Sequence, residues 1–438
     1  MNISIIGTGY VGLVSGVGFA SKGHDVICVD IVEEKVEKIN RGKPPIYEKG
    51  LEDLLKEVVD QGKLIATIDI EKAIENTELT FICVGTPSSS DGSIDLSGIE
   101  KAVEDMVIPL KEKNGYHVFC VKSTVVPGTT EEKVLPILKR SGKKVGEGFG
   151  LGMNPEFLRE GIALEDFLKP DRIVLGGIDE RSLDVLSRAY DGFDTPKLKT
   201  DIKSAEMIKY TSNALLATKI SFANEISRVC EKIGIDVYDV MEGVGLDHRI
   251  NRDFLNAGAG FGGSCFPKDV SALVRFAKEN HLETKILDSV LTVNDEQPLH
   301  IVDRLNQIIG GLKGKRIAFL GLAFKGGTDD VRETRALPMV EKLLELEADV
   351  VGYDPEASEN FKELIYKDID YSENLQDALK DADICIIQND WDEFKMLEPE
   401  DFNIMKGDII VDTRRILKKE EYVDKFTYIG VGCDDQIH

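Results

Sequence analysis

Apolar runs of strand length alternate with helical patterns through the first half of the chain. Each run is rich in Ile, Val, Leu or Phe and ends in a polar or glycine-containing turn. The runs lie at 2–6, 25–29, 79–84, 117–121, 150–153 and 172–175. This alternation predicts a parallel sheet whose two faces are covered by helices.

The pattern changes near residue 200. Apolar residues recur at helical spacing from about Thr200 to Ile233, just before Gly234, and predict a long helix that Thr200 or Asp201 caps. At 1.5 Å per residue such a helix reaches roughly 50 Å, so we expect it to bridge two domains. A second α/β pattern begins at Lys315, and its strands are expected at 316–320, 349–353, 384–387, 409–411 and 428–431.

The first turn has the sequence GTGYVG, from Gly7 to Gly12, and stands between an apolar run and a helical pattern. In that context Gly7 permits a tight turn, Gly9 lets a pyrophosphate approach the backbone, and Gly12 allows close helix–strand packing. Asp30 ends the next run and would accept hydrogen bonds from ribose hydroxyls while repelling a 2′-phosphate. The turn therefore predicts a binding site for NAD rather than NADP.

A chain of 438 residues is too long for one hydrophobic core. We predict an α/β protein with two Rossmann-like domains, each a doubly wound parallel sheet, joined by a central helical region that contains the long bridging helix. The expected boundaries are 1–199 for the N-terminal NAD-binding domain, 200–300 for the central region and 301–438 for the C-terminal domain.

Composition narrows the possible partners. The chain has 54 basic and 79 acidic residues and a net charge of −25, which disfavours nucleic acid and anionic membrane surfaces. It has no apolar run of membrane-spanning length and no cleavable leader pattern, so a cytoplasmic protein is expected. The seven cysteines show no metal-ligand spacing, and no metal is expected.

One cysteine differs from the others in its surroundings. Cys265 follows three glycines in GFGGSCFPKD, where Lys268 could favour the reactive thiolate and Asp269 could exchange protons. The alternative is a small packed side chain, which is the expected role of the cysteines inside apolar runs and helical patterns. Those cysteines are Cys28, Cys83, Cys120, Cys230 and Cys385.

Other polar residues are of interest because of their positions. Thr86, Thr124 and Glu156 follow strands at the edge where parallel sheets bind ligands, although turns are also common there. Lys209 and Asn213 are four residues apart and share a helix face, which by itself favours a solvated face. The second α/β pattern offers basic residues as phosphate ligands or as ordinary surface residues, namely Lys325, Arg332, Arg414 and Arg415.

The chain resembles the UDP-glucose/GDP-mannose dehydrogenase family over essentially its whole length. The resemblance rests on GTGYVGL from Gly7, CVGTP from Cys83, KST from Lys122, NPEFLREG from Asn154, KYTSNALLATKISFANE from Lys209, GFGGSCFPKD from Gly260, AFKGGTDDVRET from Ala323 and DTRR from Asp412. It implies a four-electron oxidation of a nucleotide sugar at C6, in two hydride transfers to NAD, through a thiohemiacetal and a thioester on Cys265. It also implies a homodimer in which Arg249 crosses to the neighbouring site.

The resemblance implies roles for the other catalytic residues as well. Lys209 would stabilise the oxyanion of each addition, and Asn213 would support it. Asp269 and Thr124 would hold the water that takes part in proton transfer. Glu156 would be the general base toward the thioester.

Two further sets of residues follow from the matching motifs. The expected cofactor contacts are Gly7, Gly9, Tyr10, Val11, Gly12, Asp30, Lys35, Thr86, Thr124, Glu160, Lys268 and Arg332. The expected substrate contacts are Glu156, Phe157, Leu158, Glu160, Lys209, Asn213, Arg249, Phe254, Gly260, Phe261, Cys265, Phe324, Lys325 and Arg414.

Several hypotheses for substrate and reaction stay open. Relatives that act on UDP-N-acetylhexosamines tend to carry an arginine at the position of Phe157, and DHRI from Asp247 together with the cysteine loop favours UDP-glucose over GDP-mannose. The other hypotheses are a two-electron hydroxyacid-type dehydrogenase with a structural Cys265, and a catalytically idle NAD-binding protein.

Overall fold

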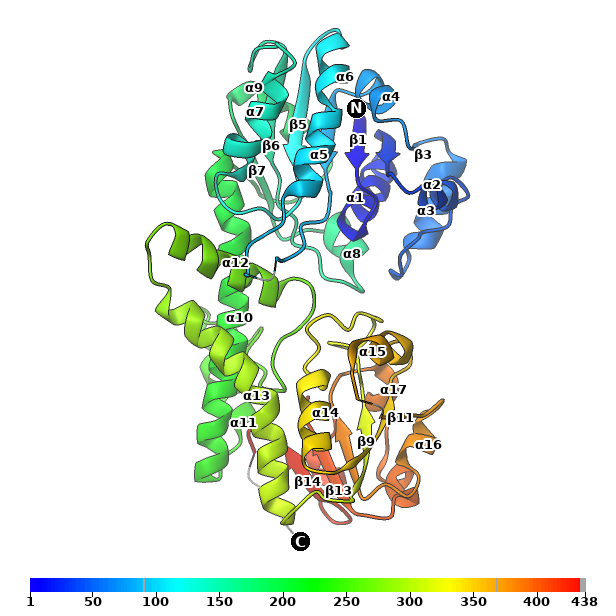
Figure 1. Ribbon diagram of the computed structural model, residues 1–438, viewed down its shortest axis with the longest axis vertical. Coiled ribbons are helices and arrows are strands. Elements are labelled where there is room, and N and C mark those ends of the chain that lie inside the picture. The colour runs from blue at the N-terminus through cyan, green and yellow to red at the C-terminus, as the bar shows by residue number, and fades with distance from the viewer. Residues whose placement is uncertain (90, 368, 434–438) are drawn as a thin grey trace. The chain divides into compact units, whose positions relative to one another are not determined.

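The computed structural model describes residues 1–89, 91–367 and 369–433. The chain forms two compact units, Met1–Ser212 and Asn213–His438, and the division between them falls inside the long helix α10, Ile202–Ile233. Each unit is a sheet with helices on both sides (Figure 1). The predicted α/β class with two Rossmann-like sheets and a long connecting helix is therefore confirmed.

The first unit is built on an eight-stranded sheet with the strand order β3-β2-β1-β4-β5-β6-β7-β8. Its strands are β1 Asn2–Ile6, β2 Asp25–Val29, β3 Leu64–Thr67, β4 Leu79–Ile82, β5 His117–Val121, β6 Phe149–Met153, β7 Ile173–Gly177 and β8 Lys197–Thr200. The order reverses between β1 and β4, which is the switch point where open α/β sheets bind ligands. The apolar runs did not predict the edge strands β3 and β8. Strand β8 exposes two of its four residues, and β3 is only four residues long.

The loop that connects β6 to β7 lies at the carboxyl edge of this sheet. The strands from β3 to β6 are parallel, whereas β7 pairs with β6 in the antiparallel direction. The linking residues, 154–172, do not cross back over the sheet, because α8, Ala163–Leu168, packs against α1, Tyr10–Ser21. The segment that begins with Asn154 therefore stays where ligands of such sheets bind.

Two apolar layers cover the first sheet, one on each face. Ile3 and Ile5 of β1 belong to one layer and Ile6 to the other, as expected for side chains that alternate along a strand. The first layer is formed with α1, α8, α2 Glu33–Asn40, α3 Leu51–Asp60 and α9 Glu180–Ala189. The second layer is formed with α4 Ile70–Asn76, α5 Ser97–Asp105, α6 Val107–Glu112, α7 Leu135–Lys139 and the start of α10.

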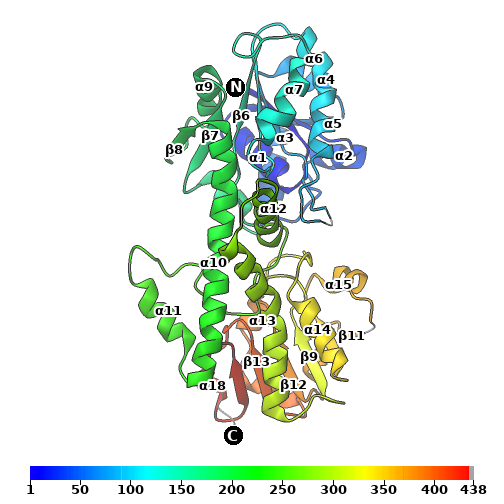
Figure 2. The same cartoon turned by 60° about the vertical axis from the view of Figure 1, so that its left-hand side comes forward.

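Helix α10 is the long helix in Figure 2, and both of its ends follow the sequence signals. The Asp201 carboxylate accepts a hydrogen bond from the Ser204 N–H at 2.8 Å, so Asp201 caps the first turn. Gly234 follows the last turn with a φ of +72°, a left-handed conformation that glycine adopts without strain.

The second unit contains a six-stranded parallel sheet with the strand order β11-β10-β9-β12-β13-β14. Its strands are β9 Arg316–Leu320, β10 Asp349–Tyr353, β11 Asp370–Tyr371, β12 Ile384–Ile387, β13 Ile409–Asp412 and β14 Thr427–Gly430. One apolar layer joins the sheet to α10, α11 Val237–Gly245, α13 Lys285–Ile309 and α14 Ala336–Glu345. The remaining helices are α12 Phe266–Glu279, α15 Ser358–Leu364, α16 Leu375–Leu379, α17 Asp392–Lys395 and α18 Lys419–Tyr422. Within the described ranges, every helix is too short or too polar to cross a membrane.

Candidate active site

The glycine-rich turn between β1 and α1 has the shape that a dinucleotide needs. A Cβ on Gly12 would lie 1.9 Å from the Gly7 carbonyl oxygen, so only glycine permits this approach of helix to strand. A Cβ on Gly9 would meet no atom within 4 Å, and no side chain caps the N-terminus of α1. The residues present therefore fit a pyrophosphate against the N–H groups that begin α1.

Asp30 stands beside this turn at the end of β2. Its carboxylate accepts hydrogen bonds from the Thr8 N–H at 2.9 Å, the Thr8 hydroxyl at 2.6 Å and the Val32 N–H at 3.0 Å. Burial raises the Asp30 pKa, but these hydrogen bonds and the charge of Lys35 outweigh burial and hold the pKa below its ordinary value. Asp30 is therefore an anion at neutral pH, and it keeps acceptor capacity for ribose hydroxyls.

Tyr10 joins the glycine turn to two distant loops, a contact that no pattern in the sequence predicted. Its hydroxyl donates to the Glu48 carboxylate. The Gly161 N–H donates to the Tyr10 hydroxyl at 2.7 Å and to Glu48 at 2.9 Å. Burial and the hydrogen bond to Glu48 raise the pKa of Tyr10, so its hydroxyl stays a neutral donor. The contact holds Glu160, the residue before Gly161, near the start of α1.

Glu156 and Lys209 form a buried ion pair in the first unit. Glu156 follows β6, Lys209 lies on α10, and their charged atoms are 2.8 Å apart with side chains only 7% and 4% exposed. The ring of Phe157 lies 5.6 Å from the Lys209 ammonium and 3.9 Å from the Arg172 guanidinium. Arg172 also donates to the Ser212 hydroxyl on α10 at 3.2 Å. The structure therefore brings together Glu156, Phe157 and Lys209, which lie in two separate motifs of the sequence.

Glu156 is ionised despite its burial. Burial alone raises the Glu156 pKa, but the charge and hydrogen bond of Lys209, the Leu158 N–H and the charge of Lys122 together hold the pKa below its ordinary value. The Leu158 N–H donates to the carboxylate at 2.6 Å. A carboxylate that is anionic at neutral pH is in the state that a general base requires.

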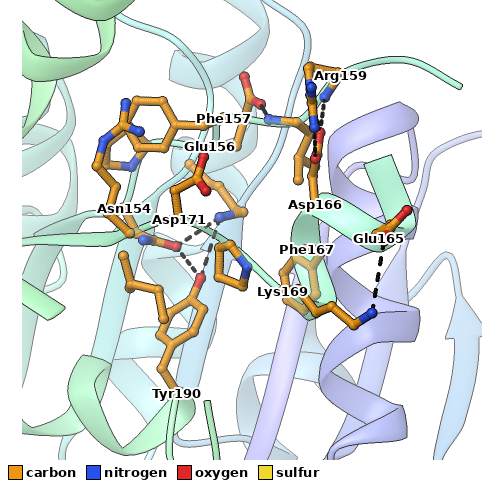
Figure 3. Close-up of a pocket in the computed structure, with 16 residues that line it drawn as sticks. Asn154, Glu156, Phe157, Arg159, Glu165, Asp166, Phe167, Lys169, Asp171 and Tyr190 are labelled. Carbon is orange, nitrogen blue, oxygen red and sulfur yellow. Dashed lines mark hydrogen bonds and ion pairs between the residues drawn. The ribbon is translucent and has the colours of Figure 1, made fainter. Parts of the chain in front are cut away.

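Glu156 also lines a cavity of about 330 Å³ in the first unit. Figure 3 shows Asn154, Glu156, Phe157 and Tyr190 together around this cavity. Nearby, the tips of β4 and β5 are joined, because the Thr86 hydroxyl donates to the Thr124 carbonyl at 3.0 Å. Both tips lie at the carboxyl edge, as their positions in the sequence predicted.

Cys265 lies in the second unit, at the N-terminus of α12. A helix N-terminus favours negative charge, and the thiolate is the nucleophilic form of cysteine. The side chain is partly exposed, whereas the other six cysteines, all within the described part of the chain, are buried. The Ser264 hydroxyl lies 3.6 Å from the Cys265 sulfur.

Asp269 lies one turn further along α12 and is 1% exposed. Its carboxylate accepts hydrogen bonds from the Asn213 amide and from the Lys268 ammonium, each at 2.6 Å. The amide of Asn213 thus supports Asp269, a contact that the shared helix face with Lys209 did not predict. The ammonium of Lys268 is likewise placed on Asp269.

Three amide side chains hold the backbone of the cysteine loop, and sequence reasoning missed them. Asn294 accepts a hydrogen bond from the Phe261 N–H at 2.7 Å and donates to the Phe261 carbonyl at 3.0 Å. Gln297 donates to the Gly258 carbonyl at 3.0 Å, and Asn224 accepts from the Gly258 N–H at 2.8 Å. These amides lie on α10 and α13, so two long helices fix the loop that carries Cys265.

Aromatic rings predicted to contact substrate gather around the same loop. A Cβ on Gly263 would lie 2.8 Å from the ring of Phe324, so the loop after β9 packs directly on the glycines. The rings of Phe254 and Phe261 lie 6.2 and 6.0 Å from the ring of Phe266, the first residue of α12. These rings hold the start of α12, next to Cys265, in an apolar setting.

The predicted basic ligands lie on loops of the second unit. Arg249 and Arg332 each pair with the aspartate two residues earlier, at 2.5 and 2.6 Å, and their side chains are 77% and 63% exposed. The Arg414 guanidinium lies 3.8 Å from the Asp390 carboxylate, and the Lys325 ammonium lies 5.5 Å from an aromatic ring. The described residues contain no group of three His, Cys, Asp or Glu suited to a metal ion.

The fold and the glycine turn define an NAD-binding α/β protein of the dehydrogenase class. Sequence models of three domains of one family match the chain, namely the NAD binding domain at 1–194, the central domain at 203–296 and the UDP binding domain at 318–419. The chain belongs to the UDP-glucose/GDP-mannose dehydrogenase family. It is an NAD-dependent oxidoreductase.

Similar proteins match over nearly their whole length. UDP-glucose 6-dehydrogenase AglM of Haloferax volcanii is 45% identical over 430 residues, which cover 97% of this chain and 99% of AglM. The structure of a UDP-glucose dehydrogenase from Pyrobaculum islandicum matches with a TM-score of 0.91 and 43% identity, covering 99% of this chain and 98% of that one. The structure of a UDP-D-ManNAc dehydrogenase from Pyrococcus horikoshii matches with a TM-score of 0.85 and 29% identity, covering 99% of both chains.

Proposed function

We propose that this chain oxidises the C6 alcohol of UDP-glucose to a carboxylate, with two NAD and one water consumed per sugar. The observation that carries the proposal is the environment of two residues that such chemistry needs. Glu156 is an ionised, buried base paired with Lys209, and Cys265 lies at a helix N-terminus one turn before Asp269. The relatives named for UDP-glucose, at 45% and 43% identity, support this substrate over the sugar of the relative at 29%.

The carbon to be oxidised passes through two covalent states. NAD, when bound at the glycine turn, accepts the hydride that leaves C6 in each oxidation. The hydroxyl proton leaves with the first hydride, and C6 becomes an aldehyde. The Cys265 thiolate then bonds to the aldehyde carbon, and the oxygen anion takes up a proton to give a thiohemiacetal. Loss of that proton and of a second hydride leaves a thioester on Cys265.

Hydrolysis of the thioester restores the enzyme. Glu156 takes a proton from water as the water oxygen bonds to the thioester carbon, the carbon–sulfur bond breaks, and the product leaves as a carboxylate. The Lys209 ammonium stabilises the oxygen anion that forms in each addition. Asp269, held by Asn213, would share with Thr124 the water that relays the protons.

The remaining predicted contacts complete the proposal. We assign NAD binding to 1–199, the central region to 200–300 and nucleotide-sugar binding to 301–438. The rings around the cysteine loop would face the sugar, Lys325 and Arg414 would meet the pyrophosphate of the nucleotide sugar, and Arg332 would reach NAD. The ion pairs of Arg249 with Asp247 and of Arg332 with Asp330 are at the surface, so they are weak enough for either arginine to exchange its aspartate for a phosphate.

A homodimer is the second part of the proposal. Leu215, Phe222 and Val229 are seven residues apart on α10 and are 60%, 51% and 52% exposed. This spacing places them on one face of the helix, and an exposed apolar stripe of this kind marks an interaction surface. We propose that a second copy covers the stripe and that Arg249 reaches the neighbouring substrate.

The covalent route is tested with Cys265→Ser and a matched control, Cys230→Ser. The wild-type chain, quenched during turnover of UDP-glucose, should carry a nucleotide-sugar adduct on the peptide that contains Cys265. Cys265→Ser should bind NAD as the wild type does but form no UDP-glucuronate in steady state, whereas Cys230→Ser should turn over normally. Unchanged product formation by Cys265→Ser would refute the route, and a higher kcat/KM with GDP-mannose or a UDP-N-acetylhexosamine would overturn the substrate.

A further inference from the structure

Lys122 is a buried cation that the proposed reaction does not use. It follows β5 and is 3% exposed. Its ammonium donates to the amide oxygen of Asn154 at 2.8 Å and to the Tyr190 hydroxyl at 3.5 Å, and the ring of Phe81 lies 5.8 Å away. Among the described residues, no carboxylate lies within 4.0 Å of it. Burying an ammonium whose hydrogen-bond partners are all neutral costs free energy of folding. The Lys122 ammonium is therefore expected to interact with a more distant anion.

The anion that stabilises the Lys122 ammonium can be identified from the ionisable groups around it. Burial and, to a lesser extent, the charge of Lys209 lower the pKa of Lys122, while Cys83, Cys120 and Glu156 act to raise it. Burial also raises the pKa of the Cys83 thiol to about 12 and raises that of Cys120 further, so both thiols are neutral at neutral pH. The Glu156 carboxylate is therefore the anion that stabilises Lys122, and Lys122 in turn helps to hold the Glu156 pKa down.

Lys122 and Glu156 line the same cavity. Both residues line the cavity of about 330 Å³. Figure 3 labels Glu156 there, together with Asn154 and Tyr190. The Tyr190 hydroxyl donates to the Asn154 amide oxygen at 2.5 Å, so the two groups that hold the ammonium also hold each other. A polar cavity of this size admits water, so the ammonium acts on the carboxylate across a hydrated space.

Lys209 has two tasks in the proposed reaction. It pairs with Glu156 at 2.8 Å, and it must also meet the oxygen anion that forms on the substrate. Whenever the ammonium turns toward the substrate, Glu156 loses part of its stabilising partner, and burial drives it toward the protonated form. We propose that Lys122 acts on Glu156 across this cavity as a second cation outside the ion pair, a positioning residue that keeps Glu156 ionised while Lys209 contacts the substrate. The inference rests on the proposed role of Glu156 as the base of thioester hydrolysis.

Two variants remove the charge of Lys122 in different ways. Lys122→Met deletes it at nearly constant side-chain length, and Asn154→Asp neutralises it by placing a carboxylate of the same shape against the ammonium. In both, the acidic limb of the kcat profile with UDP-glucose should move up by about one pH unit, so that turnover below the limb falls about tenfold and recovers at higher pH. NADH formation before hydrolysis, measured by stopped flow, should keep its wild-type pH dependence.

Tyr190→Phe is the control for a merely structural role. It removes the hydroxyl that contacts Lys122 and Asn154 but leaves the charge, so it should lower the melting temperature without moving the acidic limb. An acidic limb that stays in place in both charge variants, or that moves as far in Tyr190→Phe, overturns the inference. Glu156→Gln separates this outcome from the proposed function, because full hydrolysis in that variant would remove Glu156 as the base altogether.

Discussion

Two glycines of the nucleotide turn provide a matched test that separates cofactor binding from folding. A Cβ on Gly12 would lie 1.9 Å from the Gly7 carbonyl oxygen and 3.1 Å from the Cys83 Cβ, so α1 must move away from β1 to admit a methyl group. Residues 13–20 of α1, which follow Gly12, are buried, so this movement disturbs the core. Overpacking costs about 1–3 kcal/mol, and a backbone clash lies at the upper end of that range. We expect Gly12→Ala to lower the free energy of unfolding by about 3 kcal/mol.

Gly9→Ala should behave in the opposite way. The added Cβ meets no atom within 4 Å, and the Gly9 backbone, with φ −68° and ψ −168°, suits alanine. The free energy of unfolding should therefore change by less than about 0.5 kcal/mol. The methyl group would, however, stand where the pyrophosphate approaches α1. Losing charge-assisted hydrogen bonds there costs about 2–3 kcal/mol, so the Kd for NAD should rise about 30- to 150-fold.

The two quantities are measured independently. Urea unfolding followed by circular dichroism gives the free energy of unfolding, and calorimetric titration gives the Kd for NAD. A Gly9→Ala variant that binds NAD like the wild type, or that loses as much stability as Gly12→Ala, would refute the reasoning.

Three further predictions concern catalysis, pH and assembly. Lys209→Ala should slow formation of the second NADH and hydrolysis of the thioester by at least about tenfold each, because the ammonium stabilises the oxygen anion that forms when the thiolate and then water add to C6, and stopped-flow rates equal to the wild type would exclude that role. Burial lowers the pKa of His117 to about 3, below its unfolded value of about 6.5, so protonation favours the unfolded chain. Stability should be complete above pH 6.5 and fall by about 1.4 kcal/mol per pH unit below it, and the difference in urea midpoint between pH 7.5 and pH 5 should shrink in His117→Asn; an equal difference in both proteins would contradict this account. Phe222→Glu should give monomers in analytical ultracentrifugation with reduced turnover, and an unchanged mass would count against the proposed interface.

The sequence predicted the parts of the fold that depend on local pattern. Apolar runs such as 117–121 are buried on both faces of a parallel sheet, so they appear as continuous hydrophobic segments. The tips that carry Thr86, Thr124 and Glu156 lie at the carboxyl edge because strand ends fix their positions. Asp201 and Gly234 end the long helix by capping rules that act within one turn.

Contacts between distant segments could not be predicted in this way. The reversal of β7 depends on the packing of α8 against α1, and nothing in the segment 172–175 encodes its direction. The amides of Asn224, Asn294 and Gln297 are ordinary helix residues in sequence, and they become visible only when they hold the cysteine loop. Lys122 likewise stood in a recognised motif, but its burial without a carboxylate partner follows from the tertiary structure alone.

The amount of NADH formed from limiting UDP-glucose tests the central claim most directly. With excess NAD and the reaction carried to exhaustion, the account predicts two NADH per sugar, with UDP-glucuronate as the product. One NADH per sugar would contradict it, because Cys265 would then have no covalent step to perform and the chain would be a two-electron dehydrogenase.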